Sequence, residues 1–142
     1  MRVSDVMTSA VQMCLAGDNL VSVARKMREL NVGALPVMEE EKVIGMITDR
    51  DIVVRAIAEE RNPRSATVRE AMTYNTVSCA EDASLSEAVE IMEENKVRRL
   101  LVEDSDERLV GIVSLGDIAV HGDVELSAEA LSVISEPSAP KY

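Results

Sequence analysis

Two stretches of the sequence carry a hydroxyl and a carboxylate at the same spacing. They are VIGMITDRDI, residues 43–52, and LVGIVSLGDI, residues 109–118. Each has a glycine, two aliphatic residues and a hydroxyl residue in that order, and an aspartate three positions after the hydroxyl. A carboxylate can accept two hydrogen bonds from the vicinal hydroxyls of a ribose, and a hydroxyl beside free backbone N–H groups can receive a phosphate. The pattern therefore predicts a site for a nucleoside or nucleotide.

The candidate residues of the two stretches divide by chemistry. Thr48 pairs with Asp51, and Ser114 pairs with Asp117. The chain has no Trp, no Phe and only 2 Tyr, so aliphatic side chains would have to flank a purine ring. Burying apolar surface stabilises a complex by about 25 cal/mol per Å², which is sufficient to hold a purine ring between aliphatic side chains. The candidates for this role are Met46, Ile47, Ile112 and Val113.

The same hydroxyls and acids have a purely structural interpretation. Thr-x-x-Asp and Ser-x-x-Asp resemble capping boxes, in which the hydroxyl caps the start of a helix and the acid three residues later bonds back to the backbone of the capping residue. This interpretation does not by itself require a glycine and two aliphatic residues ahead of the hydroxyl in both stretches. Both interpretations stay open at this point.

The two stretches belong to a longer internal duplication. A shift of 65 positions superimposes identical residues from Val3 on Val68 to Val37 on Val102, and one inserted residue then changes the shift to 66. A repeat of this length is a supersecondary unit that does not bury its apolar face alone, so we expect the two copies to pack on each other.

Each copy shows the same order of elements. An extended stretch precedes a helical segment, residues 19–31 or 84–96, whose apolar positions recur at helical spacing. Asp18 and Ser84 are the expected N-caps of these helices. Two short apolar runs separated by a charged turn predict a β-hairpin, and DIVVRAIAEER or the shorter DIAVHG predicts a second helix.

The copies are therefore expected to be tandem β-α-β-β-α repeats of a mixed α/β (α+β) fold. The first repeat covers residues 1–64 and the second covers residues 65–123. In residues 124–142, apolar residues recur at helical spacing until Pro137, which predicts a C-terminal helix and tail.

Composition excludes several classes of function. The formal net charge of −11 repels polyanions, and the chain has few aromatic side chains to stack on bases. The apolar runs are far shorter than the roughly 20 residues of a membrane-spanning helix, and no signal peptide is recognisable. We expect a cytoplasmic protein that binds neither nucleic acid nor a membrane.

Residues for catalysis or for a metal site are scarce. His121 is the only histidine, and no nucleophile elbow or phosphate-binding loop is present. The two cysteines, Cys14 and Cys79, cannot complete a usual four-ligand zinc site with one histidine. Burial on strands is the favoured interpretation of both, while a disulfide or a redox role stays open. We expect no enzymatic activity and no metal.

Two β-α-β-β-α copies that carry Gly-h-h-[Thr/Ser]-x-x-Asp resemble a tandem pair of cystathionine-β-synthase (CBS) domains, a Bateman module. The resemblance runs from Val3 to His121, and VGALPV…GMITDRDIVVRA is similar to stand-alone bacterial and archaeal CBS-pair proteins, including hypoxic-response-type proteins. It implies two repeats packed with pseudo-twofold symmetry and a regulatory module that binds an adenosine-containing ligand in clefts between them. The ligand classes implied are AMP, ADP, ATP, S-adenosylmethionine or NADH.

The resemblance also implies roles and partners. Asp51 and Asp117 match the ribose-binding acid, Thr48 and Ser114 match the hydroxyl that meets phosphate or ribose, and the four aliphatic residues match the adenine-flanking positions. No cofactor is required, a homodimer is expected, and the effector protein is unknown. The alternative is a structural or protein-interaction CBS pair without a ligand, or one whose clefts are lined by the tail of a partner chain.

The resemblance implies that the two clefts are unequal. The second copy has Arg98 and Arg99 where nucleotide-binding members carry a His-Arg pair directed at phosphates, whereas the first copy has Gly33 and Ala34. Arg50 is then the nearest candidate cation of the first copy. Arginines that follow helix 84–96 could instead complement its C-terminal dipole or stay solvated.

Overall fold

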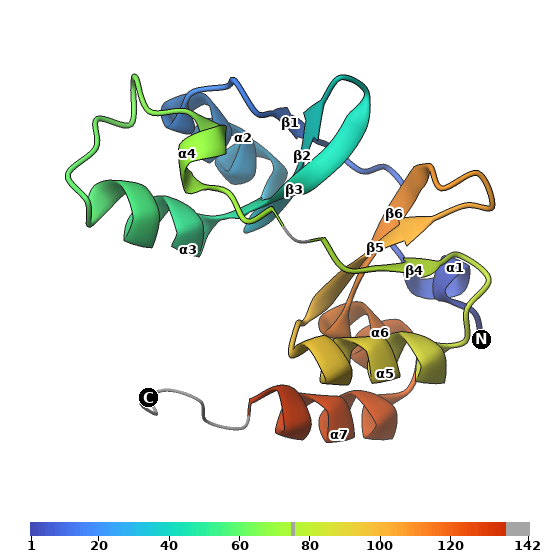
Figure 1. Cartoon of the computed structure of the whole chain (residues 1–142). Helices are drawn as coiled ribbons and strands as arrows, with labels where there is room; N and C mark the ends of the chain where they lie inside the picture. Colours follow the sequence, from blue (N-terminus) through green and yellow to red (C-terminus); the bar gives the residue numbers. More distant parts are fainter. Residues whose placement is uncertain (75, 136–142) are drawn as a thin grey trace. The chain divides into compact units, whose positions relative to one another are not determined.

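The structure of the chain, a computed structural model, describes residues 1–74 and 76–135 (Figure 1). The chain forms two compact units. The middle unit is Gln12–Thr76, and the terminal unit combines Met1–Val11 with the chain from Val77 onward. None of the described helices combines the length and the apolar content needed to cross a membrane.

The middle unit contains one three-stranded sheet and the helices that flank it. Strand β1 is parallel to β2, and β2 is antiparallel to β3, in the order β1-β2-β3. The predicted hairpin is confirmed, with Leu35 opposite Ile47. The elements are β1 (Cys14–Leu15), α2 (Leu20–Leu30), β2 (Ala34–Glu39), β3 (Lys42–Thr48), α3 (Asp49–Ile52), the π-helix η1 (Val53–Ile57) and α4 (Val68–Ala71).

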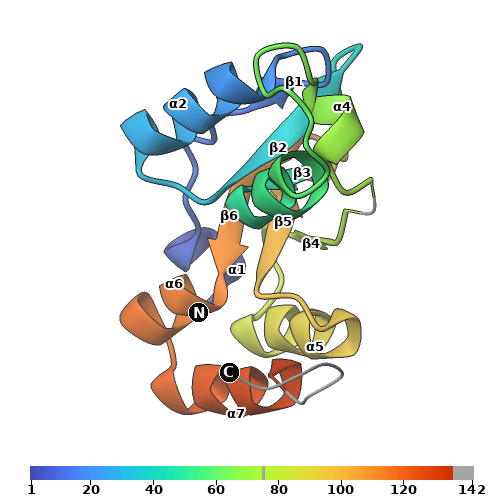
Figure 2. The same cartoon turned by 90° about the vertical axis from the view of Figure 1, so that its left-hand side faces the viewer.

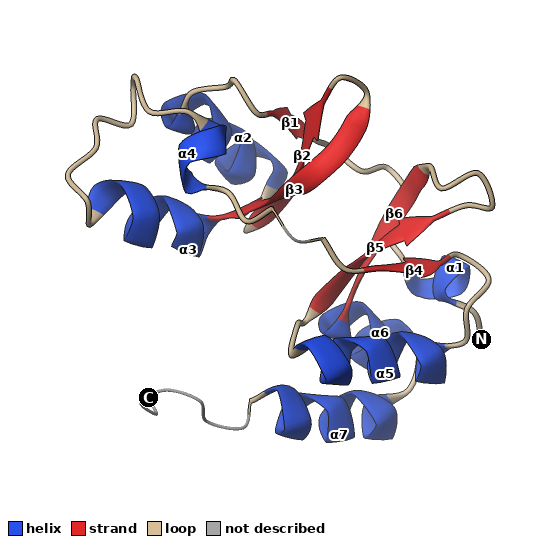
Figure 3. Cartoon of the chain, in the orientation of Figure 1, coloured by secondary structure: helices blue, strands red, loops and turns tan. Residues whose placement is uncertain are grey.

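The terminal unit repeats this arrangement and adds a helix. Its sheet has the order β4-β5-β6 with the same directions, and Leu100 lies opposite Val113 (Figure 3). The C-terminal helix predicted from the sequence is present as α7, which packs beside α5 and α6 (Figures 1 and 2). Pro137 lies outside the described residues. The elements are α1 (Val3–Val6), β4 (Ser78–Ala80), α5 (Leu85–Asn95), β5 (Arg99–Glu103), β6 (Leu109–Ser114), α6 (Leu115–His121) and α7 (Val124–Ile134).

The two long helices begin at side-chain caps. Ser84 caps α5 as predicted, because its Oγ accepts a hydrogen bond from Glu87 N at 3.1 Å. The prediction for α2 was wrong by one residue: Asn19 is the N-cap, and its side chain accepts from Ser22 N at 2.9 Å. Asp18 instead accepts from the backbone N–H of Leu15 in the preceding turn. Two polar residues that can both cap stand side by side, and only the turn geometry decides between them.

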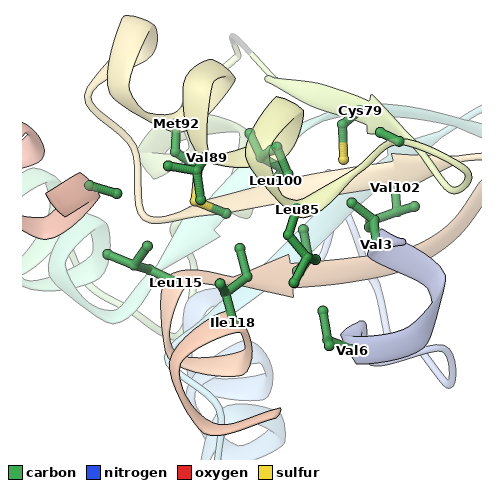
Figure 4. Packing of buried hydrophobic residues seen from close by; sticks show 14 residues of the cluster. Val3, Val6, Cys79, Leu85, Val89, Met92, Leu100, Val102, Leu115 and Ile118 are labelled. Carbon is green, nitrogen blue, oxygen red and sulfur yellow. The ribbon is translucent and has the colours of Figure 1, made fainter. Parts of the chain in front are cut away.

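Each unit has its own apolar core. Fully buried aliphatic side chains fill the middle unit, with Leu20, Val37 and Ile47 at 0% exposure. The core of the terminal unit joins α5, β5 and α6 to the helix at the start of the chain (Figure 4). Its members include Val3, Val6, Val89, Met92, Leu100, Val102, Leu115 and Ile118.

The compact units do not coincide with the sequence repeats. Helix α1 stands at the start of the first repeat, but Val3 N donates to Ala83 O at 2.8 Å and its side chain lies in the core of the terminal unit. Helix α4 stands at the start of the second repeat, but Val68 N donates to Asp18 O at 2.9 Å in the middle unit. Each unit therefore contains the short helix with which the other repeat begins.

Candidate ligand-binding site

The two strand-to-helix corners have the same geometry. Thr48 ends β3, its Oγ1 accepts from Asp51 N at 3.0 Å, and Thr48 N donates to Asp51 Oδ2 at 3.0 Å. Ser114 ends β6 and exchanges the corresponding bonds with Asp117 at 3.0 and 2.9 Å. The capping-box interpretation of both motifs is therefore confirmed.

Each capping box leaves part of its acid available. In the portion of the chain that the structure describes, the cap occupies Oδ2 of Asp51 and of Asp117, and no protein donor meets Oδ1. Both aspartates are half-buried. A carboxylate held in this way keeps acceptor sites for hydroxyl groups of a ligand, because each oxygen can accept two hydrogen bonds.

Strand alternation divides the four aliphatic candidates into two kinds. Ile47 and Val113 are both 0% exposed and belong to the cores of their units. Met46 and Ile112 precede them and lie on the opposite face of the strand, where they are half-buried. Burial therefore gives Ile47 and Val113 no surface for a ligand, and only Met46 and Ile112 have side chains that could flank a ring.

The glycine of each stretch is required by a second chain segment on the outer edge of the strand. Met46 and Thr73 exchange two backbone hydrogen bonds of 2.9 Å, so the segment after α4 pairs with β3 next to Gly45. A Cβ on Gly45 would overlap the carbonyl oxygen of Thr73 and the Met72 side chain. Close backbone approach therefore explains why this position lacks a side chain.

The terminal unit repeats this close approach with residues from the start of the chain. Ile112 and Thr8 exchange backbone hydrogen bonds of 3.0 and 2.9 Å. A Cβ on Gly111 would lie 2.9 Å from the carbonyl oxygen of Thr8 and would also meet Met7. Thr8 and Thr73 thus lie beside Ile112 and Met46, although the sequence analysis did not include them among the site residues. Their signal was the Met-Thr pair that the duplication keeps in both copies.

Three predicted residues line one hollow of the terminal unit. Arg98, Arg99 and Ser114 bound a depression of about 470 Å³ whose other walls are the start of α6 and one side of α7. Arg99 and Ser114 are direct partners across β5 and β6, and Arg98 O accepts from Leu115 N at 2.8 Å. The guanidinium of Arg98 donates to Ser135 Oγ, at the end of α7, over 3.4 Å. Two exposed arginines therefore stand beside the Ser114 corner.

The corresponding position of the middle unit is acidic. Gly33 stands where the terminal unit has Arg98, and a Cβ there would lie 3.1 Å from Asp49 Oδ2. Asp49 occupies the repeat position of the apolar Leu115, and its Oδ1 accepts from Arg50 N at 2.8 Å. The Arg50 side chain is exposed. This corner has one cation and an additional carboxylate, which is unfavourable for a phosphate.

Cys14 and Cys79 are buried free thiols, as the favoured interpretation predicted. Burial raises the pKa of each to about 11, so the reactive thiolate is scarce near neutral pH. Within residues 1–74 and 76–135, no three His, Cys, Asp or Glu side chains lie close enough together to hold a metal ion. His121 is exposed in the last turn of α6.

The repeated units with these corners define the chain as a pair of CBS domains. The sequence model of the CBS domain family matches residues 3–57 and 68–121. The chain belongs to this family, as its two similar sheets with flanking helices lead one to expect.

Related proteins of similar length share most of this chain. It is 41% identical over 138 residues to the uncharacterized protein YlbB of Bacillus subtilis, which covers 95% of this chain and 92% of that protein. It is 36% identical over 136 residues to Hypoxic response protein 1 of Mycobacterium tuberculosis, with 95% and 94% covered.

Solved structures of relatives include ligand and metal complexes. The crystal structure of Hypoxic Response Protein I with two coordinated zinc ions superimposes with a TM-score of 0.75 at 37% identity, over 85% of this chain and 98% of that chain. The CBS domain pair of protein MJ0100, in complex with 5'-methylthioadenosine and S-adenosyl-L-methionine, has a TM-score of 0.73 at 27% identity, over 84% of this chain and 97% of that chain.

Proposed function

We propose that the chain is a regulatory module that binds an adenosine-containing ligand and passes on the bound state through a change of conformation or assembly. The observation that carries this proposal is the pair of equivalent corners. In each corner the helix cap engages Oδ2 of the aspartate carboxylate and leaves Oδ1 available for a ligand. The adenosine compounds bound to the CBS pair of MJ0100 support the ligand class. AMP, ADP, ATP, S-adenosylmethionine and NADH all carry the adenosine that the corners would recognise.

The residues of each corner have separate tasks in this proposal. Oδ1 of Asp51 or Asp117 accepts hydrogen bonds from the ribose hydroxyls, which are donors that suit an ionised carboxylate. Met46 or Ile112 packs against the adenine ring. Ile47 and Val113 act only by holding the strand against the core of their unit, since neither side chain is exposed.

The two corners differ in the charge available for a phosphate. Arg98 and Arg99 line the hollow beside Ser114, and planar guanidinium groups can hold phosphate oxygens with two parallel hydrogen bonds. Arg50 is the nearest candidate of the middle unit, where Asp49 opposes it. We infer one high-affinity site for a phosphorylated ligand per chain, located at Ser114 and Asp117.

The signal needs a partner molecule. A homodimer is the simplest assembly, and a ligand that binds one arrangement of the dimer more tightly would shift the population toward that arrangement. An effector protein, still unidentified, would then read the arrangement. The chain itself requires no cofactor in this proposal and carries out no reaction.

A ligand-free CBS pair that serves structure or protein interaction is the second candidate. One observation favours it: each hydroxyl at the corners is already engaged in capping its helix. Under this alternative, the acid and the hydroxyl stabilise the helix start and have no further role.

Isothermal titration calorimetry with AMP, ATP, S-adenosylmethionine and NADH separates the two candidates. We expect heat that saturates with at least one of these compounds and a melting temperature that rises with its concentration. Guanosine monophosphate serves as the matched control ligand, because it has the same ribose and phosphate but a different base. Absence of binding by all four adenosine compounds would leave the ligand-free CBS pair as the function.

A further inference from the structure

Helix α7 forms part of the wall of the hollow beside the Ser114 corner. Four of its residues line the same depression of about 470 Å³ as Arg98 and Ser114: Val124, Ser127, Ala128 and Leu131. The helix therefore bounds the space in which the proposed function places a phosphate. A ligand that fills this space and the position of α7 depend on each other.

The packing of α7 in the terminal unit is apolar and one-sided. Ala130 is 0% exposed, and Leu126 and Ile134 pack against the terminal core, where α7 lies beside α5 and α6 (Figures 1 and 2). Val124 is 67% exposed and Leu131 is 45% exposed. Apolar burial has no preferred direction. It therefore holds α7 on the unit without by itself fixing the distance between the end of α7 and the start of β5.

A directional contact joins these two places. The guanidinium of Arg98, just before β5, donates to Oγ of Ser135, the C-cap residue of α7, over 3.4 Å. Both residues are exposed. The backbone of Arg98 is fixed independently, because its carbonyl oxygen accepts a hydrogen bond from Leu115 N at 2.8 Å. The side chain of Arg98 can therefore change its partner while its backbone stays in place.

A phosphate is a stronger partner for Arg98 than this hydroxyl. Hydrogen bonds between two charged groups are roughly twice as strong as neutral ones, and a long, exposed bond to a hydroxyl contributes little. Ser135 lies beyond the α7 residues that line the hollow, whereas Ser114 lies in it. A planar guanidinium that turns one edge toward a phosphate beside Ser114 must leave Ser135.

We propose that the phosphate of a bound adenosine ligand replaces Ser135 as the partner of Arg98 and thereby loosens the last turn of α7, residues 131–135. This inference rests on the proposed function, since it requires a phosphate beside Ser114, and it names the change of conformation that an effector protein would read. The coupling is reciprocal: the contact between Arg98 and Ser135 weakens ligand binding by the same factor by which the ligand weakens the contact.

Amide hydrogen exchange of the ligand-free protein, followed by mass spectrometry, tests the contact without any ligand. Arg98→Ala should speed up exchange in residues 131–135 by about two- to fivefold, because one exposed hydrogen bond is lost. Arg99→Ala is the matched control, since Arg99 is the neighbouring exposed arginine but the bond to Ser135 belongs to Arg98. Equal exchange in the two variants would overturn the contact as a restraint on α7.

ATP should have the same effect on the wild type. Calorimetry first gives the ATP concentration that saturates the protein, and exchange in residues 131–135 should then rise by about two- to fivefold. Adenosine at saturation should leave this exchange unchanged, because it has no phosphate. Binding of ATP without faster exchange would overturn the inference and leave the proposed function intact. Absence of ATP binding would overturn the phosphate site and the inference with it.

Substitutions at Ser135 test the reciprocal effect on affinity. Ser135→Ala should raise the affinity for ATP by about two- to fivefold, because Arg98 no longer has a competing partner. Ser135→Glu should lower it by about two- to fivefold, because a carboxylate pairs with Arg98. The affinity for adenosine should stay the same in both variants. Circular dichroism checks that the variants are folded, as expected for an exposed helix end.

Ser132 provides the matched control, since it is an exposed serine one turn earlier on α7. Ser132→Ala should bind ATP like the wild type, and Ser132→Glu should weaken ATP binding less than Ser135→Glu does. Equal losses for the two glutamate variants would show a general effect of negative charge. That result would overturn the competition between Ser135 and phosphate for Arg98.

Discussion

Gly45 and Gly111 connect the sequence motif to the site at the scale of single residues. Both glycines allow a neighbouring backbone segment to pair with the strand that ends at the corner. Without that close approach, Thr73 and Thr8 could not lie beside Met46 and Ile112. The glycine is therefore a packing requirement, while the hydroxyl and the acid organise the helix start.

An alanine at either glycine tests this packing. Gly45→Ala and Gly111→Ala should each lower the free energy of unfolding by about 1–3 kcal/mol, because the new methyl group overlaps the carbonyl oxygen of the paired threonine and a methionine side chain. Gly17→Ala is the matched control, since nothing lies within 4 Å of a Cβ added there. Urea denaturation measures the three variants. Equal stability of Gly17→Ala and Gly45→Ala would contradict the packing argument.

The buried cysteines predict a dependence of stability on alkaline pH. Burial raises the pKa of Cys14 and Cys79 from 9.0 to about 11 in the folded chain. A group whose folded pKa is raised stabilises the fold below its unfolded pKa, and this contribution is lost as the pH rises from 9 through 11. The free energy of unfolding should therefore fall over this interval.

The variant with Cys14→Ala and Cys79→Ala provides the comparison. Denaturation at pH 8, 9, 10 and 11 should show a smaller fall for this variant than for the wild type. Lysines and tyrosines titrate in both proteins, so the difference between the two curves isolates the thiols. Parallel curves would show that the thiols do not contribute.

At this scale the sequence predicted the chemistry better than the contacts. The spacing of Thr48 and Asp51 predicted both a binding corner and a capping box, and the structure has the box. Adjacent residues of a strand point to opposite faces, so only one aliphatic residue of each pair, Ile47 or Val113, is buried in the core. The sequence shows two adjacent aliphatic residues in each copy and does not reveal which of them faces the core. The partners of Gly45 lie far along the chain, so local patterns do not reveal them.

Helical periodicity predicted the long elements well. The apolar spacing of residues 19–31 and 84–96 corresponds to α2 and α5, and α7 appears where the tail showed the same period. The four-residue helices α1 and α4 are too short to show a period, and their exchange between the two repeats depends on contacts distant in sequence. Helix α3 continues as the π-helix η1 from Val53, and no pattern in the sequence predicted this change.

The packing of α7 against the terminal core predicts that a larger side chain lowers the free energy of unfolding at one position of the helix but not at another. Ala130 is 0% exposed, so Ala130→Leu should lower the free energy of unfolding by about 1–3 kcal/mol through overpacking. Ala128 lies on the exposed side of the same helix, and Ala128→Leu should change the stability little. Thermal unfolding of both variants checks this prediction. A larger cost for Ala128→Leu would mean that α7 packs through its other side.

For the whole molecule, duplication followed by divergence explains why two similar units would differ in function. The terminal unit has Arg98, Arg99 and a covering helix, whereas the middle unit has Gly33, Asp49 and an open groove. The first difference favours a phosphate beside the terminal corner in the proposed function, and the second leaves aliphatic side chains of the middle unit exposed.

The charge difference predicts ligand discrimination. Replacing Arg98 and Arg99 by alanine should weaken ATP binding by about tenfold or more, because charged hydrogen bonds contribute about 1.5–3 kcal/mol. Binding of adenosine, which has no phosphate, should change much less. Arg50→Ala should affect both ligands little. Equal losses for ATP and adenosine would contradict phosphate contact by the arginines.

The most direct test of ligand recognition compares two acidic residues that have the same structural role in capping a helix. Asp117 and Glu87 each occupy the third position of a capping box, at α6 and α5 respectively. Asp117→Ala and Glu87→Ala should therefore have similar costs in stability, and calorimetry with the adenosine ligand bound by the wild type should show binding lost only in Asp117→Ala. Equal affinity of the two variants would contradict the assignment of Asp117 to the ribose.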